Sequence, residues 1–282
     1  MSIELKKVSK RFVDNVVLDG VDFFVDVGET VALLGPSGVG KSVLLKHVIG
    51  LIKPDSGEVW VDGQLVPLLG RKELAELRSR IGYVFQNGAL FDSMDVFENI
   101  RLGITDDKQY ADKDYCIQRV RECLRLVNLP EDVGRKFPAE LSGGMRKRVG
   151  IARAIAGKPV YLLYDEPTSG LDPVNADVID SLIERLQQEI GVTSVVVTHD
   201  VRGAFRVADR IALLAQAKIR AVGTAEEIIA SQDPVVQQFL ERDLEMAVIQ
   251  GAGFQVSGAR RDAPDTRRPT PDTGNGAGEG ED

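Results

Sequence analysis

The sequence predicts an α/β fold that combines a core of parallel strands, a layer of antiparallel strands and an insert of helices. Short apolar runs at residues 31–34, 160–164 and 194–198 are typical of buried parallel strands, because they are brief and rich in Val and Leu. Apolar residues at helical spacing over 178–186 separate the last two runs, which is the alternation of an α/β core. With 282 residues, of which 43% are apolar, the chain is long enough for one large domain with appendages.

The antiparallel layer is predicted from the beginning of the chain. Short alternating or β-branched segments lie at 3–5, 16–18, 23–25 and 58–61, and Asp62 with Gly63 marks a turn. These segments precede and follow the run at 31–34. We therefore expect them to form a layer beside that strand.

The helical insert is predicted between about Asp95 and Ala156. The pattern becomes helical from about Lys72, and Pro130 and Pro138 mark breaks between helices of the insert. After Asp165 the α/β pattern returns. The later elements that we expect are a hairpin at 211–214 and 217–222 and two helices at 225–230 and 234–240.

The last part of the chain differs in composition from the rest. Residues 1–245 are expected to hold the folded domain, whereas residues 251–282 are rich in Gly, Pro, Asp, Arg and Thr. Such a segment cannot bury enough apolar surface to offset the entropy of ordering. We therefore expect residues 251–282 to be a disordered tail.

Composition and charge exclude several classes of protein. The net charge of -8 and the pI near 5.0 argue against a nucleic-acid backbone as the main partner. No apolar run reaches about 18 residues, the length needed to cross a bilayer, and the N-terminal residues lack the apolar core of a signal peptide. We therefore expect a soluble cytosolic protein.

Three residues of types that often carry chemistry are assigned no function. Cys116 and Cys123 lie about two turns apart on one predicted helix, too far for a disulfide. We expect buried free thiols, because no second Cys pair or His cluster accompanies them. His47 falls among apolar residues of the helix after residue 42, and we expect it to be a boundary residue of that helix.

A phosphate-binding loop lies between the predicted strand at 31–34 and the next helix. Its glycines let backbone N–H groups turn toward phosphate oxygens, its lysine reaches the terminal phosphates, and its last serine can bind magnesium. The sequence therefore predicts binding of a nucleoside triphosphate. The loop consists of Gly35, Pro36, Ser37, Gly38, Val39, Gly40, Lys41 and Ser42.

Two carboxylates and a histidine follow two other predicted core strands. Asp165 and Glu166 end the run at 160–164, and His199 follows the run at 194–198. Asp165 suits Mg²⁺ together with Ser42, and Glu166 suits orienting and polarising the attacking water. His199 would stand at the same sheet edge, where it could bind a γ-phosphate or that water. An acidic pair after a strand is also common at the start of a solvated loop.

Further motifs give the chain a resemblance to a known family. The order and spacing of Gln86, a signature loop at 141–145, a segment at 169–172 and His199 resemble those of the ATP-binding cassette (ABC) ATPases of transporters. The resemblance covers about residues 3–240. It implies a P-loop NTPase fold with a RecA-like parallel core, ATP and Mg²⁺ as cofactors, and ATP hydrolysis.

The signature loop also has a direct physical interpretation. Ser142 can cap the helix that follows it, and Gly143 and Gly144 leave the first N–H groups of that helix open to an anion. A plain capped helix would have the same residues. The resemblance implies instead that Ser142, Gly143 and Gly144 bind the nucleotide of a second copy, with two ATP molecules held between head-to-tail cassettes.

Other site residues are implied by the resemblance. Phe12 would stack on adenine, although an aromatic residue in a strand also suits a core. Gln86 would sense the γ-phosphate or Mg²⁺ and link the site to the membrane partner. Asp172 would lie near the phosphate loop of the second subunit.

A narrower resemblance follows from smaller departures from the general pattern. The segment 87–99 lacks the proline and threonine of many cassettes, Met145 replaces the usual Gln, and 233–234 and 237–240 carry further matches. These features resemble the phospholipid-transport ATPases of the Mla, toluene-tolerance and Mce-associated group. They imply a homodimer beneath a membrane permease, a lipid-carrier subunit, and a peripheral position on the cytoplasmic face of the inner membrane. The alternatives are an importer for another substrate, such as an amino acid or osmolyte, and a non-transport cassette.

Overall fold

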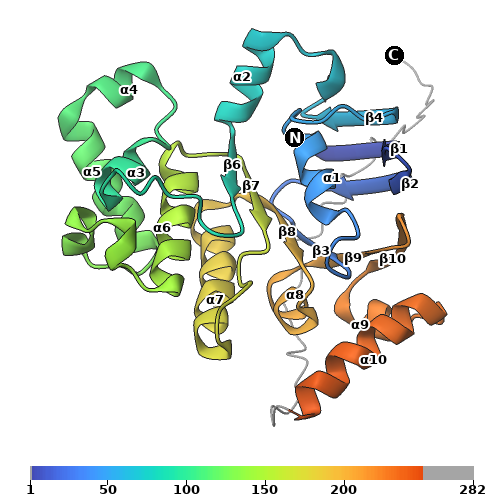
Figure 1. Ribbon diagram of the computed structural model, residues 1–282. Coiled ribbons are helices and arrows are strands. Elements are labelled where there is room, and N and C mark those ends of the chain that lie inside the picture. Colours follow the sequence, from blue (N-terminus) through green and yellow to red (C-terminus); the bar gives the residue numbers. More distant parts are fainter. Residues whose placement is uncertain (1, 250–282) are drawn as a thin grey trace, which may run out of the picture.

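The fold is built on two β-sheets and the helices that cover them (Figure 1). The computed structural model describes the chain from residue 2 to residue 249, and its side chains as far as residue 241. The predicted tail at 251–282 lies outside the described residues. Within the described part the predicted α/β fold class is confirmed, with a parallel core, an antiparallel layer and a helical insert.

The central sheet has the strand order β10-β9-β3-β8-β7-β6 and is parallel except for the edge strand β10. Its middle strands are buried along their whole length, which explains their continuous apolar sequence. Leu34 pairs with Thr198 and Asp165 with Val197, so three strands end at one edge of the sheet. The strands are β3 (Thr30–Leu34), β6 (Ile81–Val84), β7 (Tyr161–Asp165), β8 (Thr193–Thr198), β9 (Arg210–Ala215) and β10 (Lys218–Gly223).

The second sheet is antiparallel and has the order β2-β1-β4-β5. Its strands are β1 (Ile3–Phe12), β2 (Asn15–Val25), β4 (Ser56–Val61) and β5 (Gln64–Leu65). The two strands expected at 16–18 and 23–25 are one strand, because the chain continues through Gly20 at φ 61° with shifts in register instead of a turn. The prediction of an antiparallel layer beside β3 is confirmed.

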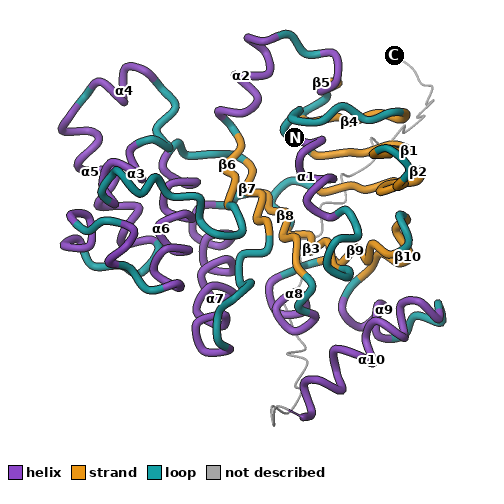
Figure 2. Tube along the Cα trace, viewed as in Figure 1, coloured by secondary structure: helices purple, strands orange, loops and turns teal. Residues whose placement is uncertain are grey.

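Helices cover both faces of the central sheet (Figure 2). Helix α1 packs between the two sheets, whereas α8, α9 and α10 pack on the opposite face of β3 and β9. The helices of the α/β core and its extensions are α1 (Lys41–Val48), α2 (Arg71–Ser79), α7 (Pro173–Ile190), α8 (Val201–Val207), α9 (Ala225–Ile229) and α10 (Pro234–Ile249), with a 3₁₀ turn η1 (Val66–Leu68).

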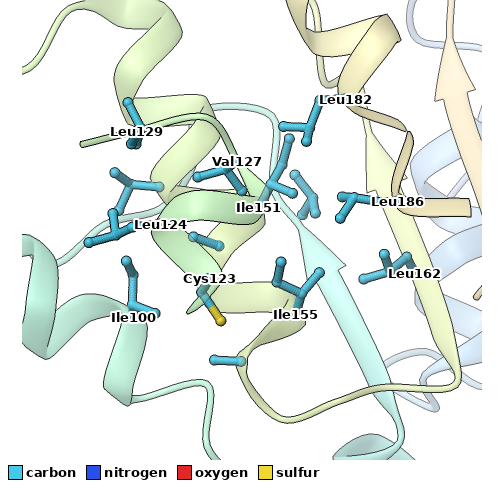
Figure 3. Packing of buried hydrophobic residues seen from close by; sticks show 14 of the residues in the cluster. Ile100, Cys123, Leu124, Val127, Leu129, Ile151, Ile155, Leu162, Leu182 and Leu186 are labelled. Atoms are coloured by element: carbon cyan, nitrogen blue, oxygen red, sulfur yellow. The ribbon is translucent and has the colours of Figure 1, made fainter. Parts of the chain in front are cut away.

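The insert between β6 and β7 is helical, as predicted. It contains α3 (Val96–Arg101), α4 (Asp107–Ala111), α5 (Lys113–Leu126), α6 (Gly143–Ala156) and two 3₁₀ turns, η2 (Glu131–Arg135) and η3 (Pro138–Glu140). Figure 3 shows its core, where Ile100, Leu124 and Ile151 pack together and Leu162 of β7 and Leu186 of α7 extend the same cluster. Cys116 and Cys123 are free and buried in this core, which confirms their prediction.

One prediction about a single residue is wrong. His47 of α1 is not a boundary residue but is almost completely buried, and its Nδ1 lies 2.7 Å from the Val43 carbonyl. Burial lowers the pKa of His47, so the neutral ring is favoured there. None of the helices within the described residues has the length and apolar character to cross a bilayer.

The contact between α7 and α8 buries a carboxyl group, Asp180. Gly203 of α8 makes this possible, because a Cβ at Gly203 would lie 3.0 Å from an oxygen of Asp180 and of Asp200. Burial raises the pKa of Asp180 to about 7, and the charges of Asp200, Asp177 and Glu184 add to the effect while Arg206 opposes it. The folded protein therefore keeps a proton on Asp180 at pH values where the unfolded chain has released it.

We predict that Asp180→Asn stabilises the fold in a pH-dependent way. The pKa of Asp180 is near 3.8 in the unfolded chain and about 7 in the folded protein. Between these two pH values the wild-type protein loses stability as pH rises, because folding requires the carboxyl group to stay protonated. The variant has no carboxyl group at this position and lacks the loss. The gain should therefore be larger at pH 8 than at pH 5, by about 2 kcal/mol, or a few degrees in melting temperature. The exposed Glu189→Gln on the same helix is the control, because its charge does not act on Asp180. An equal gain for Asp180→Asn at both pH values would contradict the prediction.

Candidate functional site

The phosphate-binding loop connects β3 to α1. Two of its glycines have backbone conformations and close contacts that leave no room for a side chain. Gly35 has φ 155° and Gly40 has φ 112°, and a Cβ at Gly35 would lie 2.2 Å from the Leu214 carbonyl oxygen. A Cβ at Gly40 would lie 2.5 Å from a methyl group of Val17. Any larger residue at these two positions would displace the loop from β9 and β2.

Lys41 is the buried cation of the loop. Its Nζ donates hydrogen bonds to the carbonyl oxygens of Gly35 at 2.7 Å and Pro36 at 3.0 Å. The same atom lies 3.2 Å from Oε1 of Glu166, which follows β7. Burial lowers the pKa of Lys41, and the Glu166 carboxylate opposes that change. The loop and the end of β7 are thus joined by an ion pair.

Ser42 and Asp165 form a second link between the loop and β7. The Ser42 hydroxyl donates to Oδ1 of Asp165 at 2.6 Å. The other oxygen of Asp165 accepts from the Tyr83 hydroxyl at 2.9 Å, and burial with the nearby carboxylate raises the pKa of Tyr83. A hydroxyl and a carboxylate oxygen at this spacing are the hard ligands that Mg²⁺ prefers.

Glu166 lies between two basic side chains. Its Oε1 faces Lys41, and its Oε2 lies 2.7 Å from Nδ1 of His199. The side chain of His199 is half exposed, whereas that of Glu166 is largely buried. The backbone of Glu166 has φ 52°, in the left-handed region that is unfavourable for a residue with a Cβ. The carboxylate is therefore held at the sheet edge by contacts on both oxygens and by an uncommon backbone conformation.

Gln86 approaches the same edge from β6. Its side-chain Nε2 donates to the Ser169 hydroxyl at 3.2 Å, and its backbone carbonyl oxygen accepts from Nζ of Lys147 at 2.9 Å. Phe12, at the end of β1, is 42% exposed and therefore not part of a core. The Lys10 ammonium lies 5.4 Å from the centre of its ring.

The signature loop forms a separate cluster at the start of α6. The Ser142 hydroxyl caps α6 by accepting from the backbone N–H of Met145 at 3.2 Å. A Cβ at Gly144 would lie 3.0 Å from Oδ1 of Asn175, and Asp172 caps α7 by accepting from the same Asn175. These hydrogen bonds lower the pKa of Asp172. Within the described residues no hydrogen bond or ion pair joins this cluster to the phosphate-binding loop.

The structure thus brings together most, but not all, of the residues predicted from sequence. Contacts join Lys41, Ser42, Asp165, Glu166 and His199, and Gln86 is connected to them through its neighbours. The cluster at 142–144 with Asp172 and the side chain of Phe12 lie outside this network. Tyr83 and Lys147 were not predicted from the sequence, although a lysine on the apolar face of the helix after the signature loop was a signal that could have indicated the second of them.

A glycine-rich loop between a central parallel strand and a helix, facing an acid at the end of another strand, defines a P-loop nucleoside triphosphatase. The ABC transporter family matches residues 18–169, and the chain belongs to this family as one of its ATPases.

Several known proteins are similar to the chain along most of its length. The intermembrane phospholipid transport system ATP-binding protein MlaF of Haemophilus influenzae is 40% identical over 239 residues, which are 85% of this chain and 90% of that protein. The probable ribonucleotide transport ATP-binding protein mkl of Mycobacterium leprae is 41% identical over 243 residues, covering 85% and 69%. A dimeric post-hydrolysis structure of the ATP-binding cassette MJ0796 with ADP and Pi has a TM-score of 0.72 and 34% identity, covering 79% and 98%.

We predict that Lys41→Ala weakens nucleotide binding, because it removes a cation from a site with several phosphate-facing N–H groups. Loss of charge-assisted hydrogen bonds should lower ATP affinity by about tenfold to a hundredfold, measured by calorimetric titration. Lys46→Ala changes the same charge at the other end of α1 and should bind ATP normally. Unchanged ATP affinity in a folded Lys41→Ala protein would show that the loop is not the phosphate site.

Proposed function

We propose that the chain is the ATP-hydrolysing subunit of a phospholipid transporter and works as a homodimer beneath a membrane permease. The observation that carries the catalytic part is the Glu166 carboxylate held between Lys41 and His199 at the end of β7. The assignment to phospholipid transport is supported by the similarity to the phospholipid transport protein MlaF, which extends over most of both chains.

Phosphate binding is the task of the loop at 35–42. Its backbone N–H groups and the first turn of α1 present positive partial charge to the phosphates. The Lys41 ammonium adds a full charge beside the same loop. Phe12 is placed at the exposed end of β1, where its ring can stack on adenine.

The oxygens of Ser42 and Asp165 would hold Mg²⁺, with Gln86 as a further ligand from β6. The fit rests on the 2.6 Å separation of Ser42 Oγ and Asp165 Oδ1 and on the Tyr83 hydroxyl that orients Asp165. Bound Mg²⁺ supplies charge neutralisation at the phosphates. Gln86 also begins the segment between β6 and the helical insert, and its hydrogen bond to Ser169 connects that segment to the loop after β7.

Glu166 acts as the residue that orients and polarises the attacking water. Its Oε1 lies 3.2 Å from the Lys41 ammonium, and its contact with His199 fixes the second oxygen. The half-exposed His199 can reach a γ-phosphate or the water from the same edge. The carboxylate therefore has the position that a base requires.

A second copy of the chain would complete each site. Ser142, Gly143 and Gly144 offer helix N–H groups, and in the part of the chain that the structure describes no hydrogen bond or ion pair joins them to their own phosphate loop. Asp172 lies beside them at the start of α7. We propose that these residues meet the nucleotide of the partner, an arrangement supported by similarity to a dimeric cassette.

The remaining partners follow from the transport function. A permease would bind near the segment 86–99, a lipid-carrier subunit would belong to the same complex, and the chain would lie on the cytoplasmic face of the inner membrane. No nucleic-acid partner is proposed. The name of the similar mkl protein makes ribonucleotide transport the second candidate.

We predict that Glu166→Gln preserves ATP binding and lowers turnover by about 10²- to 10⁴-fold, because the amide keeps the shape of the side chain without its basicity. The variant should accumulate as an ATP-dependent dimer in size-exclusion chromatography. Glu189→Gln, an exposed change at the end of α7, should hydrolyse ATP normally. Hydrolysis at the normal rate by Glu166→Gln would remove Glu166 from its proposed role.

We predict that the chain, purified in detergent from its own membranes, carries a membrane protein and bound phospholipid. Phospholipid should stimulate ATP hydrolysis by that complex when it is reconstituted in nanodiscs, whereas ribonucleotides should not. The Glu166→Gln complex provides the background rate. Stimulation by ribonucleotides alone would favour the second candidate, and the absence of any membrane partner would contradict a transport function.

A further inference from the structure

One lysine of α6 connects the signature helix to the catalytic edge of the same chain. Lys147 lies one turn after Gly143, and only 7% of it is exposed. Its Nζ donates to the carbonyl oxygen of Gln86 at 2.9 Å and faces that of Glu166 at 3.3 Å. A single ammonium group therefore holds the backbones that follow β6 and β7.

Packing does not explain a lysine at this position. A buried ammonium loses hydration, and an apolar side chain of the same length would fill the space without that cost. Within the described residues Lys147 has no ion pair with a carboxylate. Its hydrogen bonds go to two peptide carbonyls, which suggests that holding these backbones is what the residue contributes.

The backbone of Glu166 depends on such contacts, because its φ of 52° is unfavourable for glutamate. Its N–H donates to the Val197 carbonyl at 2.9 Å, and its own carbonyl oxygen accepts from the N–H of Ser169 at 3.2 Å. Lys147 is the third partner of this residue's backbone groups and the one that comes from the helical insert. The direction of the Glu166 side chain follows from the orientation that these contacts impose.

The loop after Gln86 is attached to α6 by further contacts. Arg153 donates to the carbonyl oxygens of Gly88 and Ala89, both at 2.7 Å. A Cβ at Gly150 would lie 3.0 Å from the Cα of Gly88, so the two backbones touch. Helix α6 therefore holds the loop at several points, whereas among these side chains Lys147 also reaches Glu166.

We propose that Lys147 is a positioning residue for hydrolysis, which sets the place of the Glu166 carboxylate through the carbonyl groups of Gln86 and Glu166. The proposal rests on the role of Glu166 proposed above. Among the described residues, no hydrogen bond or ion pair joins Lys147 to the phosphate-binding loop, so its contribution falls on turnover and not on nucleotide affinity.

The test is steady-state ATP hydrolysis by the purified full-length protein and its variants. Lys147→Met has a similar length but no donor, and its kcat should fall about ten- to a hundredfold, with KM for ATP changed by no more than about twofold. Lys147→Arg keeps a cationic donor and should restore most of kcat. If Lys147→Met does not fold, Lys147→Leu, which also lacks a donor, replaces it, with the same split between kcat and KM expected.

Arg148→Met is the matched control. Arg148 is the next cation on α6 and is partly desolvated, but it donates to the Asn128 carbonyl at 2.8 Å, away from the site. This variant should hydrolyse ATP at the normal rate per folded protein. A decrease equal to that of Lys147→Met would show a general effect of disturbing α6 and would overturn the proposal.

A double variant separates this proposal from the proposed function. In single-turnover assays on Glu166→Gln, adding Lys147→Met should cause no further loss, because Lys147 acts through Glu166. An equal loss in both backgrounds, or a rise in KM with normal kcat, would overturn the role of Lys147 while leaving that of Glu166 intact. Normal turnover by Glu166→Gln alone would instead refute the proposed function and this inference with it.

Discussion

The parallel register of β3, β8 and β7 is the constraint on which the rest of the site depends. Pairing of Leu34 with Thr198 and of Asp165 with Val197 places three strand ends at one edge. Residues that are far apart in sequence then meet without long loops. A shift of one strand by one residue would turn its side chains to the other face and separate the Ser42 hydroxyl from Asp165.

Charge is the second organising feature of this edge. Lys41 and Glu166 are both mostly buried, and each offsets part of the desolvation cost of the other. Carbonyl oxygens complete the coordination of both buried lysines, Lys41 through the phosphate loop and Lys147 through the loops after β6 and β7. The two ammonium groups thus hold the phosphate loop and the loops after β6 and β7 in place. Because Lys147 belongs to α6, the geometry of the site depends on α6 as well as on the sheet.

Local sequence patterns predicted what depends on neighbouring residues. The phosphate loop, the buried strands and the helical insert each have a sequence period or spacing of their own, and the structure has all three. Long-range contacts left weaker signals. The burial of His47 on the inner face of α1 and the hydrogen bond from Tyr83 to Asp165 depend on how separate elements pack, which no local pattern encodes. The sequence also did not reveal that β2 is a single strand. Its pairing with β1, a contact between separate segments, extends the strand through a glycine.

The contact between Gly88 and Gly150 has a mechanical consequence. Two backbones that touch without side chains between them have no rotamers through which to absorb a displacement. Any displacement of α6 toward the loop after Gln86 would press backbone against backbone. A side chain at either glycine would push the two segments apart, so the close approach of the insert to the end of β6 depends on both positions being glycine.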